Sequence, residues 1–359
     1  MKILITGGHV TPAVAIIEEL KKNPTIQAVF VGGKYGEVKG KALSYEYQSI
    51  IHLGVRFIHL ETGRLTRLFS LFTILDFVSF PLGLFRSFCI LQKEKPDVIL
   101  SFGGYIAFPI AISAFFLRIR IFTHEQTLVP GITNRLIACF AQKIFISFPE
   151  TKRFFDKRKT ITTGNPLRTS IFHLIKKPFS IVKTRPIIYI TGGSLGSHSI
   201  NRIIEGILPD LLKKYIVIHQ TGNIAKYGDF ERLSMYKDKN YFLSRHFASD
   251  EIGSIYSVSD VIIARSGANT ICELIALQKP ALLIPLPWSA GGEQKAHALF
   301  LKEKGTAEIF SQENSDVNVL LSLIEKILHN KTTYTKNYLS IQHYFNPYAS
   351  KKIVDFIVS

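Results

Sequence analysis

The chain has 359 residues, of which 47% are apolar, 12% aromatic and 20% charged, and its formal net charge is +17. This length suits about two domains. The high apolar and aromatic fractions exclude an intrinsically disordered or collagen-like protein. The excess of positive charge indicates a polyanion, an anionic membrane surface or a phosphorylated substrate as the partner, and composition does not choose among these three.

The three cysteines, Cys89, Cys139 and Cys272, lie far apart and form no C-x-x-C pair. They predict neither a disulfide framework nor a cysteine zinc site, which fits a reducing cytosolic compartment. The apolar residues before Thr6 are too few for the core of a signal peptide, so we expect no export.

In chain order, short apolar runs each lead into a glycine-rich or polar turn. These runs are residues 2–5, 98–102, 119–123, 187–190 and 261–264. The first is followed by Thr-Gly-Gly-His and then by apolar residues at helical spacing, which is typical of a buried strand, a glycine turn and a helix start. The alternation of such strands with helix-length segments predicts parallel sheets covered by helices on both faces.

The pattern breaks between residues 161 and 185, where Gly164-Asn165-Pro166 is followed by Lys176-Lys177-Pro178. A new strand and glycine turn then begin, so we place a domain boundary near residue 165. The predicted fold class is α/β, with two facing Rossmann-like, doubly wound domains. Such sheets bind ligands at the carboxyl ends of their strands, so we expect a ligand in the interdomain cleft.

The most apolar stretch covers residues 68–85, has arginines on both sides and is interrupted by Asp76 and Pro81. Three interpretations stay open: a buried core helix, a segment lying in the plane of a membrane with a basic rim, and a true span. We favour the in-plane segment, because residues 1–182 carry +13 of the net charge and residues 183–359 only +4.

Two turns contain candidates for binding phosphate. The turn Thr191–Gly196 follows a strand and precedes a predicted helix, so its backbone N–H groups and Ser194 are candidates for holding a diphosphate, with a purely structural turn as the alternative. Arg168 follows a turn at the domain junction, and its planar fork suits a phosphate, although such an Arg is often simply solvated. Neither a Walker A loop nor G-x-G-x-x-G spacing occurs in the chain.

Glu273 and His9 carry other candidate chemistry. Glu273 stands a few residues into the predicted helix after the turn 265–268, where it can accept hydrogen bonds from ribose hydroxyls or merely complement the helix dipole. His9 lies in the first glycine turn and can exchange a proton near neutral pH, unless it is structural. No two aspartates have D-x-D spacing, so we expect no metal ion. We therefore expect Arg168, helix dipoles and backbone N–H groups to neutralise the charge of a bound diphosphate.

In their order and spacing, the motifs of this chain resemble those of one family. They are Thr6–Ala13, Ser101–Tyr105, His124–Gln126, Pro130–Arg135, Gly164–Arg168, Gly192–Ser194 and Arg265–Ala268. The family is MurG, the peptidoglycan N-acetylglucosaminyltransferases of the two-Rossmann-domain GT-B class. The resemblance covers nearly the whole chain, and the ordered set is specific although each motif alone is weak.

The resemblance implies an inverting transfer of N-acetylglucosamine from UDP-N-acetylglucosamine to the C4 hydroxyl of the muramoyl sugar on an undecaprenyl-linked acceptor, lipid I, to give lipid II. It implies no cofactor. It also implies a peripheral protein at the cytoplasmic face of the inner membrane, on an anionic membrane surface. An N-terminal acceptor domain would cover residues 1–165 and a donor domain residues 166–345, with a final helix at about 346–359 packed back on the N-terminal domain.

The resemblance further implies site residues in both domains. His9 would be the catalytic base or an acceptor-site residue, and Thr6, Gly7 and Gly8 would form the loop near the acceptor diphosphate. The other implied substrate-binding residues are Thr127 and Asn134 in the N-terminal domain, Arg168 and Ser194 at the donor diphosphate, Ala268, Asn269, Thr270, Ile271, Cys272 and Glu273 at the uridine and ribose, and Gln294 at the donor sugar.

The chain departs from the family's pattern at several positions. It has Leu4-Ile5 where the family has Gly-Gly, Thr127 where the family has Asn, and Leu195 where the family has Gln, and its segment 288–294 is one residue longer. A Thr hydroxyl donates one hydrogen bond, whereas an Asn amide offers both a donor and an acceptor. The donor or the acceptor can therefore differ from the family's.

Two other functions stay open. A UDP-N-acetylglucosamine 2-epimerase resembles the same two-domain fold and would release its product without a lipid acceptor. A basic protein that binds membrane or nucleic acid is supported by the net charge alone. No RNA- or DNA-binding signature accompanies that charge, so we expect no nucleic-acid partner.

Overall fold

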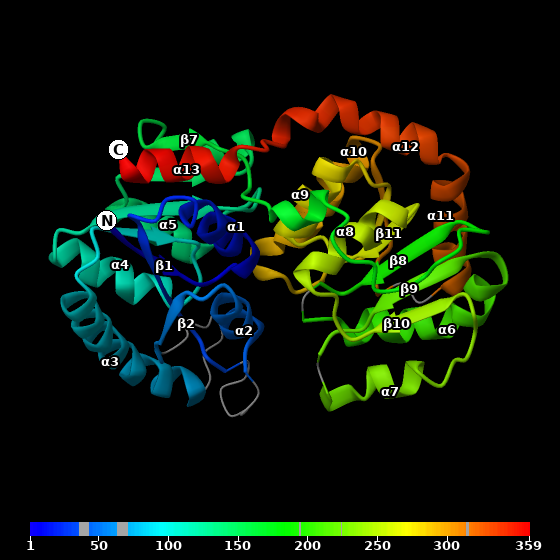
Figure 1. The fold of residues 1–359 in the computed structure, drawn as a ribbon, viewed down its shortest axis with the longest axis horizontal. Helices are drawn as coiled ribbons and strands as arrows, with labels where there is room; N and C mark the ends of the chain where they lie inside the picture. Colours follow the sequence, from blue (N-terminus) through cyan, green and yellow to red (C-terminus); the bar gives the residue numbers. More distant parts are fainter. Residues whose placement is uncertain (36–42, 63–70, 194, 224, 314–315) are drawn as a thin grey trace. The chain divides into compact units, whose positions relative to one another are not determined.

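The computed structural model describes all residues except 36–42, 63–70, 194, 224 and 314–315. Its contacts divide the chain into two compact units (Figure 1). The first unit contains Met1–Arg168 and Asn346–Ser359, so the end of the chain returns to the unit in which it began. The second unit contains Thr169–Phe345.

The first unit is built on a sheet of seven strands in the order β3-β2-β1-β4-β5-β6-β7, with all neighbours parallel. The strands are β1 (Lys2–Thr6), β2 (Gln27–Gly32), β3 (Arg56–His59), β4 (Val98–Ser101), β5 (Arg120–Glu125), β6 (Lys143–Ile146) and β7 (Thr160–Thr162). The helices are α1 (Val10–Leu20), α2 (Tyr45–His52), α3 (Leu71–Glu94), α4 (Ala107–Phe116), α5 (Ile132–Phe140) and α13 (Ala349–Val358), with a 3₁₀ turn at Pro149–Phe154.

The second unit is built on a sheet of six parallel strands in the order β10-β9-β8-β11-β12-β13. The strands are β8 (Ile187–Thr191), β9 (Ile216–Gln220), β10 (Tyr241–Ser244), β11 (Val261–Ala264), β12 (Ala281–Leu283) and β13 (Ala307–Ile309). The helices are α6 (His198–Lys214), α7 (Asp229–Leu233), α8 (Ser249–Val258), α9 (Ala268–Leu277), α10 (Glu293–Glu303), α11 (Val317–His329) and α12 (Lys331–Asn337). Short 3₁₀ segments lie at Thr169–Phe172, Ala225–Tyr227, Ala290–Gly292 and Tyr338–Tyr344.

Both sheets have the strand order of a Rossmann fold, and the first adds one strand at its edge. The predicted class, two Rossmann-like α/β domains, is therefore confirmed. The order reverses between β1 and β4 and again between β8 and β11. In the register, Thr6 lies opposite Ser101 and Thr191 opposite Ala264, so the turns after each of these strand pairs begin at the same level. That edge is where doubly wound sheets bind ligands.

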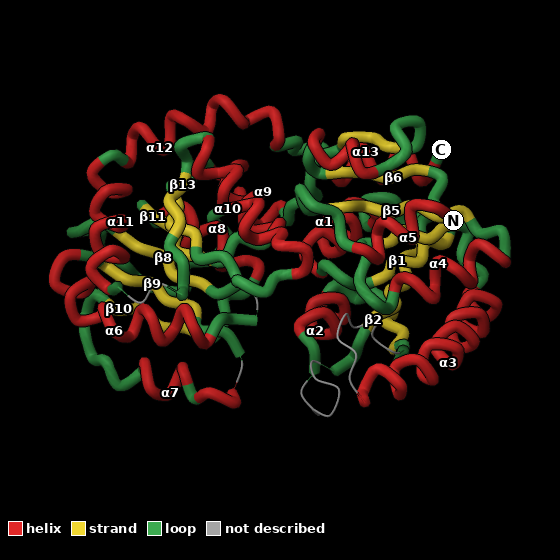
Figure 2. The backbone as a smooth tube through the Cα atoms, turned by 180° about the vertical axis from the view of Figure 1, so that it is seen from behind, coloured by secondary structure: helices red, strands yellow, loops and turns green. Residues whose placement is uncertain are grey.

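Helices cover both faces of each sheet (Figure 2). In the first unit, alternate residues of β1 enter two different cores, as expected for a strand. Ile3 and Ile5 pack with residues of α1 and α13, whereas Leu4 packs with residues of α4 and α5. All three side chains are fully buried. Because both faces of these strands are buried, the strands appear in the sequence as continuous apolar runs.

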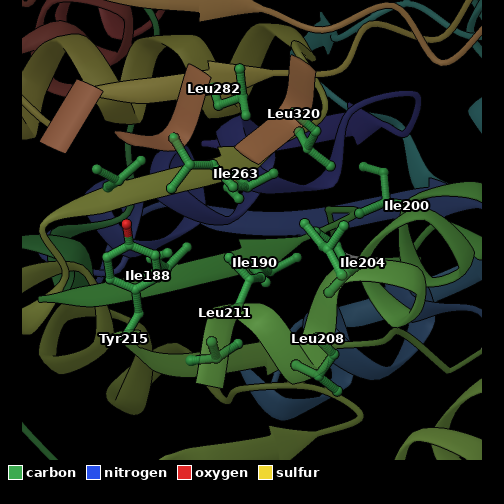
Figure 3. Close-up of a cluster of buried hydrophobic side chains, with 14 of the residues drawn as sticks. Ile188, Ile190, Ile200, Ile204, Leu208, Leu211, Tyr215, Ile263, Leu282 and Leu320 are labelled. Carbon is green, nitrogen blue, oxygen red and sulfur yellow. The ribbon is translucent and has the colours of Figure 1, made fainter. Parts of the chain in front are cut away.

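In the second unit, one apolar stripe of α6 lies against the sheet (Figure 3). Ile204, Leu208 and Leu211 recur at intervals of one helical turn and pack with Ile188 and Ile190 of β8. Each such fully buried side chain contributes about 1.5–3 kcal/mol to stability. This packing fixes the beginning of α6 at the end of β8, where the glycine turn lies.

Helix α3 runs through Pro81 without a break. A proline inside a helix removes one N–H donor but need not end the helix. Residues 68–70 of the predicted stretch lie outside the described residues. Among the helices that are described, none combines the length and the apolarity needed to cross a bilayer.

Candidate functional site

Two glycine turns touch at the edge of the first sheet where β1 and β4 end. Gly8 has a φ of +140°, and Gly103 and Gly104 have φ values of +79° and +80°, all of which favour glycine. A Cβ atom on Gly8 would collide with the Gly103 carbonyl, and one on Gly104 would press on Gly8 Cα. The two turns therefore form one continuous backbone surface at the point where the strand order reverses.

The predicted residues of the first turn differ in accessibility. The Thr6 side chain is fully buried, and the Gly7 N–H donates to Val31 O at 3.1 Å. Gly8 is exposed, and His9 is half-buried at the N-cap position of α1. Gly8 and His9 are thus open to a ligand, whereas Thr6 offers no accessible side-chain atom.

The His9 imidazole is suited to accepting a proton. Burial lowers the pKa of His9 below its ordinary value of 6.5, because burial disfavours the charged form. The neutral imidazole that results is the form that acts as a general base. Its side chain makes no capping hydrogen bond to α1, so helix capping does not explain its presence.

His124, by contrast, holds its loop in place. It is fully buried at the end of β5, with Nε2 donating to Gly164 O at 3.1 Å and Nδ1 accepting from Gln126 Nε2 at 3.0 Å. A carbonyl only accepts and an amide NH₂ only donates, so these partners fix the tautomer. Burial lowers the pKa of His124 to about 4, which keeps the imidazole neutral.

Thr127 and Asn134 are brought together by a residue that was not predicted as a site residue, the buried Glu125. Its carboxylate accepts from Thr127 Oγ1 at 2.7 Å, from Thr127 N at 2.9 Å and from Asn134 Nδ2 at 2.9 Å. Burial raises the pKa of Glu125, and these hydrogen bonds oppose the rise. Both predicted residues are themselves buried, so their polar groups fix the β5 loop from within.

Arg168 is half-buried at the end of the first unit, after a turn that is held from two sides. Gly164 has a φ of +82° and its carbonyl accepts from His124. Asn346 Nδ2 donates to Thr163 O at 2.8 Å. These contacts fix the main chain that leads to Arg168.

Two glycine turns also touch in the second sheet, where they follow the neighbouring strands β8 and β9. Gly196 has a φ of +83° and Gly222 a φ of +90°, and a Cβ atom on either would collide with the backbone of the other. Gln220 supports the turn, because its Nε2 donates to Gly193 O at 3.0 Å. The predicted residue Ser194 lies outside the described residues.

A buried arginine that was not predicted as a site residue stands beside this turn. Arg265, which follows β11, donates from Nη2 to Ser197 Oγ at 2.8 Å and to Ser199 Oγ at 2.6 Å, and from Nη1 to Ile284 O at 2.9 Å. Burial lowers its pKa to about 10, so it remains charged at neutral pH. Its described partners are all neutral oxygens, which leaves a positive charge at the N-terminus of α6 that suits an anion.

The segment predicted to hold the nucleoside forms the beginning of α9. Asn269 and Thr270 are half-exposed, whereas the side chains of Ala268, Ile271, Cys272 and Glu273 are buried. Ile271 is fully buried and its N–H donates to Gly267 O at 3.1 Å, so it offers a ligand no accessible atom. Glu273 accepts from Tyr256 Oη at 2.8 Å. It stands beyond the first turn of α9, so the helix-dipole interpretation does not apply to it.

Gln294 organises the loop after β12. Its Oε1 accepts from Leu286 N at 3.0 Å, and its carbonyl accepts from Ser266 Oγ at 2.7 Å. The same loop exposes Trp288, the only tryptophan in the sequence. Gln294 therefore links the loops that follow β11 and β12.

Within each unit, the predicted residues gather at one sheet edge. Among the described residues, no cluster of three or more His, Cys, Asp or Glu side chains could hold a metal ion. The groups present are a neutral imidazole, buried carboxylates, a buried guanidinium, glycine turns and helix N-termini. Such groups can take up a proton and stabilise a diphosphate leaving group.

Comparison with known proteins identifies the family. The Glycosyltransferase family 28 N-terminal domain matches residues 6–146, and the Glycosyltransferase family 28 C-terminal domain matches residues 187–350. A Clostridium botulinum protein is 34% identical over 99% of this chain and 96% of its own length. It is named UDP-N-acetylglucosamine–N-acetylmuramyl-(pentapeptide) pyrophosphoryl-undecaprenol N-acetylglucosamine transferase. The chain belongs to the MurG family.

Solved structures agree with the MurG assignment. The crystal structure of Acinetobacter baumannii MurG is 25% identical and matches with a TM-score of 0.69 over 99% of both chains. A UDP-GlcNAc 2-epimerase from Neisseria meningitidis, solved with UDP-GlcNAc bound, is 19% identical and matches with a TM-score of 0.68 over 100% of both chains. At that identity the epimerase shares the fold alone, whereas the similarity to MurG proteins extends to the full-length sequence.

Proposed function

We propose that this protein transfers N-acetylglucosamine from UDP-N-acetylglucosamine to the C4 hydroxyl of lipid I, with inversion at the anomeric carbon, and so makes lipid II for peptidoglycan. The observation that carries the proposal is the 34% identity to the Clostridium botulinum transferase over 99% of this chain. The protein is accordingly a UDP-N-acetylglucosamine-dependent glycosyltransferase. The reaction requires sites for two diphosphates, and the N-termini of α1 and α6, which follow the glycine turns after β1 and β8, are suited to holding them.

The two substrates are assigned to different domains in this proposal. Residues 166–345 bind the donor, with the N-terminus of α6 and Arg265 at its diphosphate and the beginning of α9 at its uridine. Residues 1–165, together with the final helix at 346–359, bind the lipid-linked acceptor. The positive charge of Arg265, which has no carboxylate partner among the described residues, supports the placement of the donor diphosphate.

In the proposed reaction, His9 takes the proton of the acceptor C4 hydroxyl while that oxygen attacks the anomeric carbon of the donor sugar. The bond from this carbon to the diphosphate breaks, and its electron pair leaves with UDP. Arg168, Arg265, the dipole of α6 and the N–H groups of the β8 turn stabilise the departing charge. The lowered pKa of His9 supports its role as the base.

We further propose that the protein is peripheral at the cytoplasmic face of the inner membrane and uses α3 and α4 to contact anionic lipid. These helices pack against each other. Phe85 on α3 is 65% exposed and Phe116 on α4 is 72% exposed, with Arg86 and Arg118 close in sequence. Exposed aromatic side chains bordered by cations are typical of proteins that bind the membrane interface. Vesicle sedimentation tests this location separately from the activity.

The activity is tested by incubating the purified chain with UDP-N-acetylglucosamine, with and without a lipid I analogue, and following UDP release. The proposal expects release that depends on the analogue. Turnover of the donor without any acceptor would contradict the proposal and favour the epimerase. Salt-sensitive DNA binding with no UDP binding by calorimetry would favour a basic binding protein instead.

A further inference from the structure

A carboxylate outside the predicted set reaches the glycine turn that carries His9. Glu46 lies in the first turn of α2, and its Oε2 accepts from Gly33 N, after β2, at 2.9 Å. The carboxylate also packs against the turn after β1, because an added Cβ atom on Gly7 would collide with it, and the neighbouring Gly8 N–H helps to lower its pKa. Glu46 therefore connects the turns after β1 and β2, and its contact with Gly7 lies two residues before His9.

Two glycines make room for this carboxylate. A Cβ atom on Gly7 or on Gly32 would collide with the Glu46 carboxyl group. Neither glycine has a φ in the left-handed region, so backbone conformation does not account for them. The space that the Glu46 carboxyl group occupies explains why both positions are glycine.

The helix that carries Glu46 is fixed to the same turn. Ser44, the N-cap of α2, accepts from Tyr47 N at 3.1 Å and donates from Oγ to Gly33 O at 2.5 Å. Ser44 N donates to Lys34 O at 2.9 Å. The carboxylate is thus held in place by its own helix cap. On the other side of the β1 turn, the Gly103 carbonyl limits the movement of Gly8.

We propose that Glu46 is a positioning residue for the transfer reaction, clamping the Gly8 backbone so that the His9 imidazole is held at the acceptor hydroxyl. This inference rests on the proposed function. Glu46 touches neither the reacting atoms nor the donor. Glu46 contributes by holding the His9 base in position. A displacement of about 1 Å in such a group lowers turnover by as much as 100-fold.

The clamp depends on the charge of Glu46. An ionised carboxylate accepts stronger hydrogen bonds from backbone N–H groups than a protonated one. Burial raises the pKa of Glu46 to about 7, and the bonds from Gly33 and Gly8 oppose that rise. The titratable groups near these turns include His9 itself, Lys34 after β2 and His59 at the end of β3, whose Nδ1 accepts from Lys34 N at 3.1 Å. They also include the Tyr105 hydroxyl beside Gly33, Tyr47 of α2 next to Lys34, and the buried His124, which interacts electrostatically with His9. Acidification through pH 7 should therefore loosen the clamp before it protonates His9.

The test compares Glu46→Gln with the native chain in the lipid I assay. The matched control is Glu19→Gln on α1, where the carboxylate pairs with Lys22 at the surface. We expect Glu46→Gln to lower kcat about 10- to 100-fold with the KM for UDP-N-acetylglucosamine unchanged within twofold. We also expect it to lose the inflection of kcat near pH 7 and to keep the native melting temperature. The control should match the native chain in every respect.

A second variant keeps the test decisive if Glu46→Gln does not fold. The Cβ atom added by Gly32→Ala would collide with the Glu46 carboxylate and with the ring of the buried Phe30. This variant should reproduce the loss of kcat with the donor KM intact, and its melting temperature reports the cost of the collision with Phe30. Native kcat and a native pH profile in a folded Glu46→Gln or Gly32→Ala protein would overturn the proposal. A native chain that transfers nothing to lipid I would instead overturn the proposed function, so the two failures are distinguishable.

Discussion

Tyr256 donates a hydrogen bond from Oη to Glu273 Oε2 at 2.8 Å, joining α8 to the second turn of α9. Both residues are buried. The bond fixes the orientation of the carboxylate at the sheet edge where β11 ends. A carboxylate held in this way can accept hydrogen bonds from vicinal hydroxyls without first losing conformational freedom, which favours binding of a ribose.

Glu273→Ala should raise the KM for UDP-N-acetylglucosamine about 10- to 100-fold with little change in kcat, because hydrogen bonds to a charged group contribute about 1.5–3 kcal/mol. Tyr256→Phe leaves the carboxylate in place and should have a smaller effect of the same kind. Steady-state kinetics at saturating acceptor measures both variants. A lower kcat with a native donor KM would show that Glu273 does not bind the donor.

His9→Ala should lower kcat about 10²- to 10⁴-fold, the range that general-base catalysis supplies. The affinity for UDP should be unchanged, because the donor site lies in the other domain of the proposal. Turnover in the UDP-release assay and calorimetry with UDP measure the two quantities. Normal turnover by the variant would refute the assignment of His9 as the base.

Gly222→Ala should destabilise the second unit and weaken UDP binding, because its Cβ would collide with the backbone of Gly196 and Leu195 at a φ of +90°. Gly206→Ala is the matched control, since nothing lies within 4 Å of its added Cβ. In the interior of α6 this substitution should stabilise by about 0.5–1 kcal/mol. Thermal unfolding and UDP calorimetry test the pair. An equal melting temperature for both variants would contradict the close approach of the two turns.

Stability should fall as the pH is lowered from about 6.5 towards 4, because two buried histidines stay neutral in the folded protein. Burial lowers the pKa of His124 to about 4 and that of His219 to about 3. The unfolded chain takes up these protons first, so each histidine lowers the free energy of unfolding by about 1.4 kcal/mol per pH unit in this window. The melting temperature of the His219→Gln variant should fall less steeply with decreasing pH than that of the native chain. His329 is exposed, and the melting temperature of the His329→Gln variant should change with pH as that of the native chain does.

Phe85→Ser combined with Phe116→Ser should reduce sedimentation with anionic vesicles and leave UDP release from a soluble acceptor analogue unchanged. These side chains are exposed on α3 and α4. The matched control is Leu174→Ser with Ile175→Ser, which removes exposed apolar side chains from the second unit. Equal vesicle binding by both double variants would remove α3 and α4 as the contact surface.

The sequence predicted the sheets and the positions of the glycine turns well, because these follow from local patterns. Apolar runs such as residues 2–5 and 187–190 are strands buried on both faces, and the turns after them contain glycines that backbone geometry requires. Membership of the MurG family was likewise predictable, because the motifs occur in a specific order along the whole chain.

The supporting residues were not predictable in the same way, because their partners are distant in sequence. Glu46 accepts a hydrogen bond from the turn after β2 and packs against the turn after β1, and Arg265 reaches serines at the beginning of α6. Glu125 stood within a recognised motif, yet only the structure shows that it binds both Thr127 and Asn134. The burial of single residues could not be predicted either, because the neighbouring sequence does not indicate that Thr6 is buried and Gly8 exposed.

Transfer of N-acetylglucosamine to a lipid-linked muramoyl acceptor changes the mass of that acceptor. The native chain is incubated with UDP-N-acetylglucosamine and a lipid I analogue, and the lipid fraction is analysed by mass spectrometry. We expect the analogue to gain one N-acetylhexosamine for each UDP released, and we expect no UDP release without the analogue. An unmodified analogue together with a 2-epimer of the donor sugar would show that the protein is not the proposed transferase.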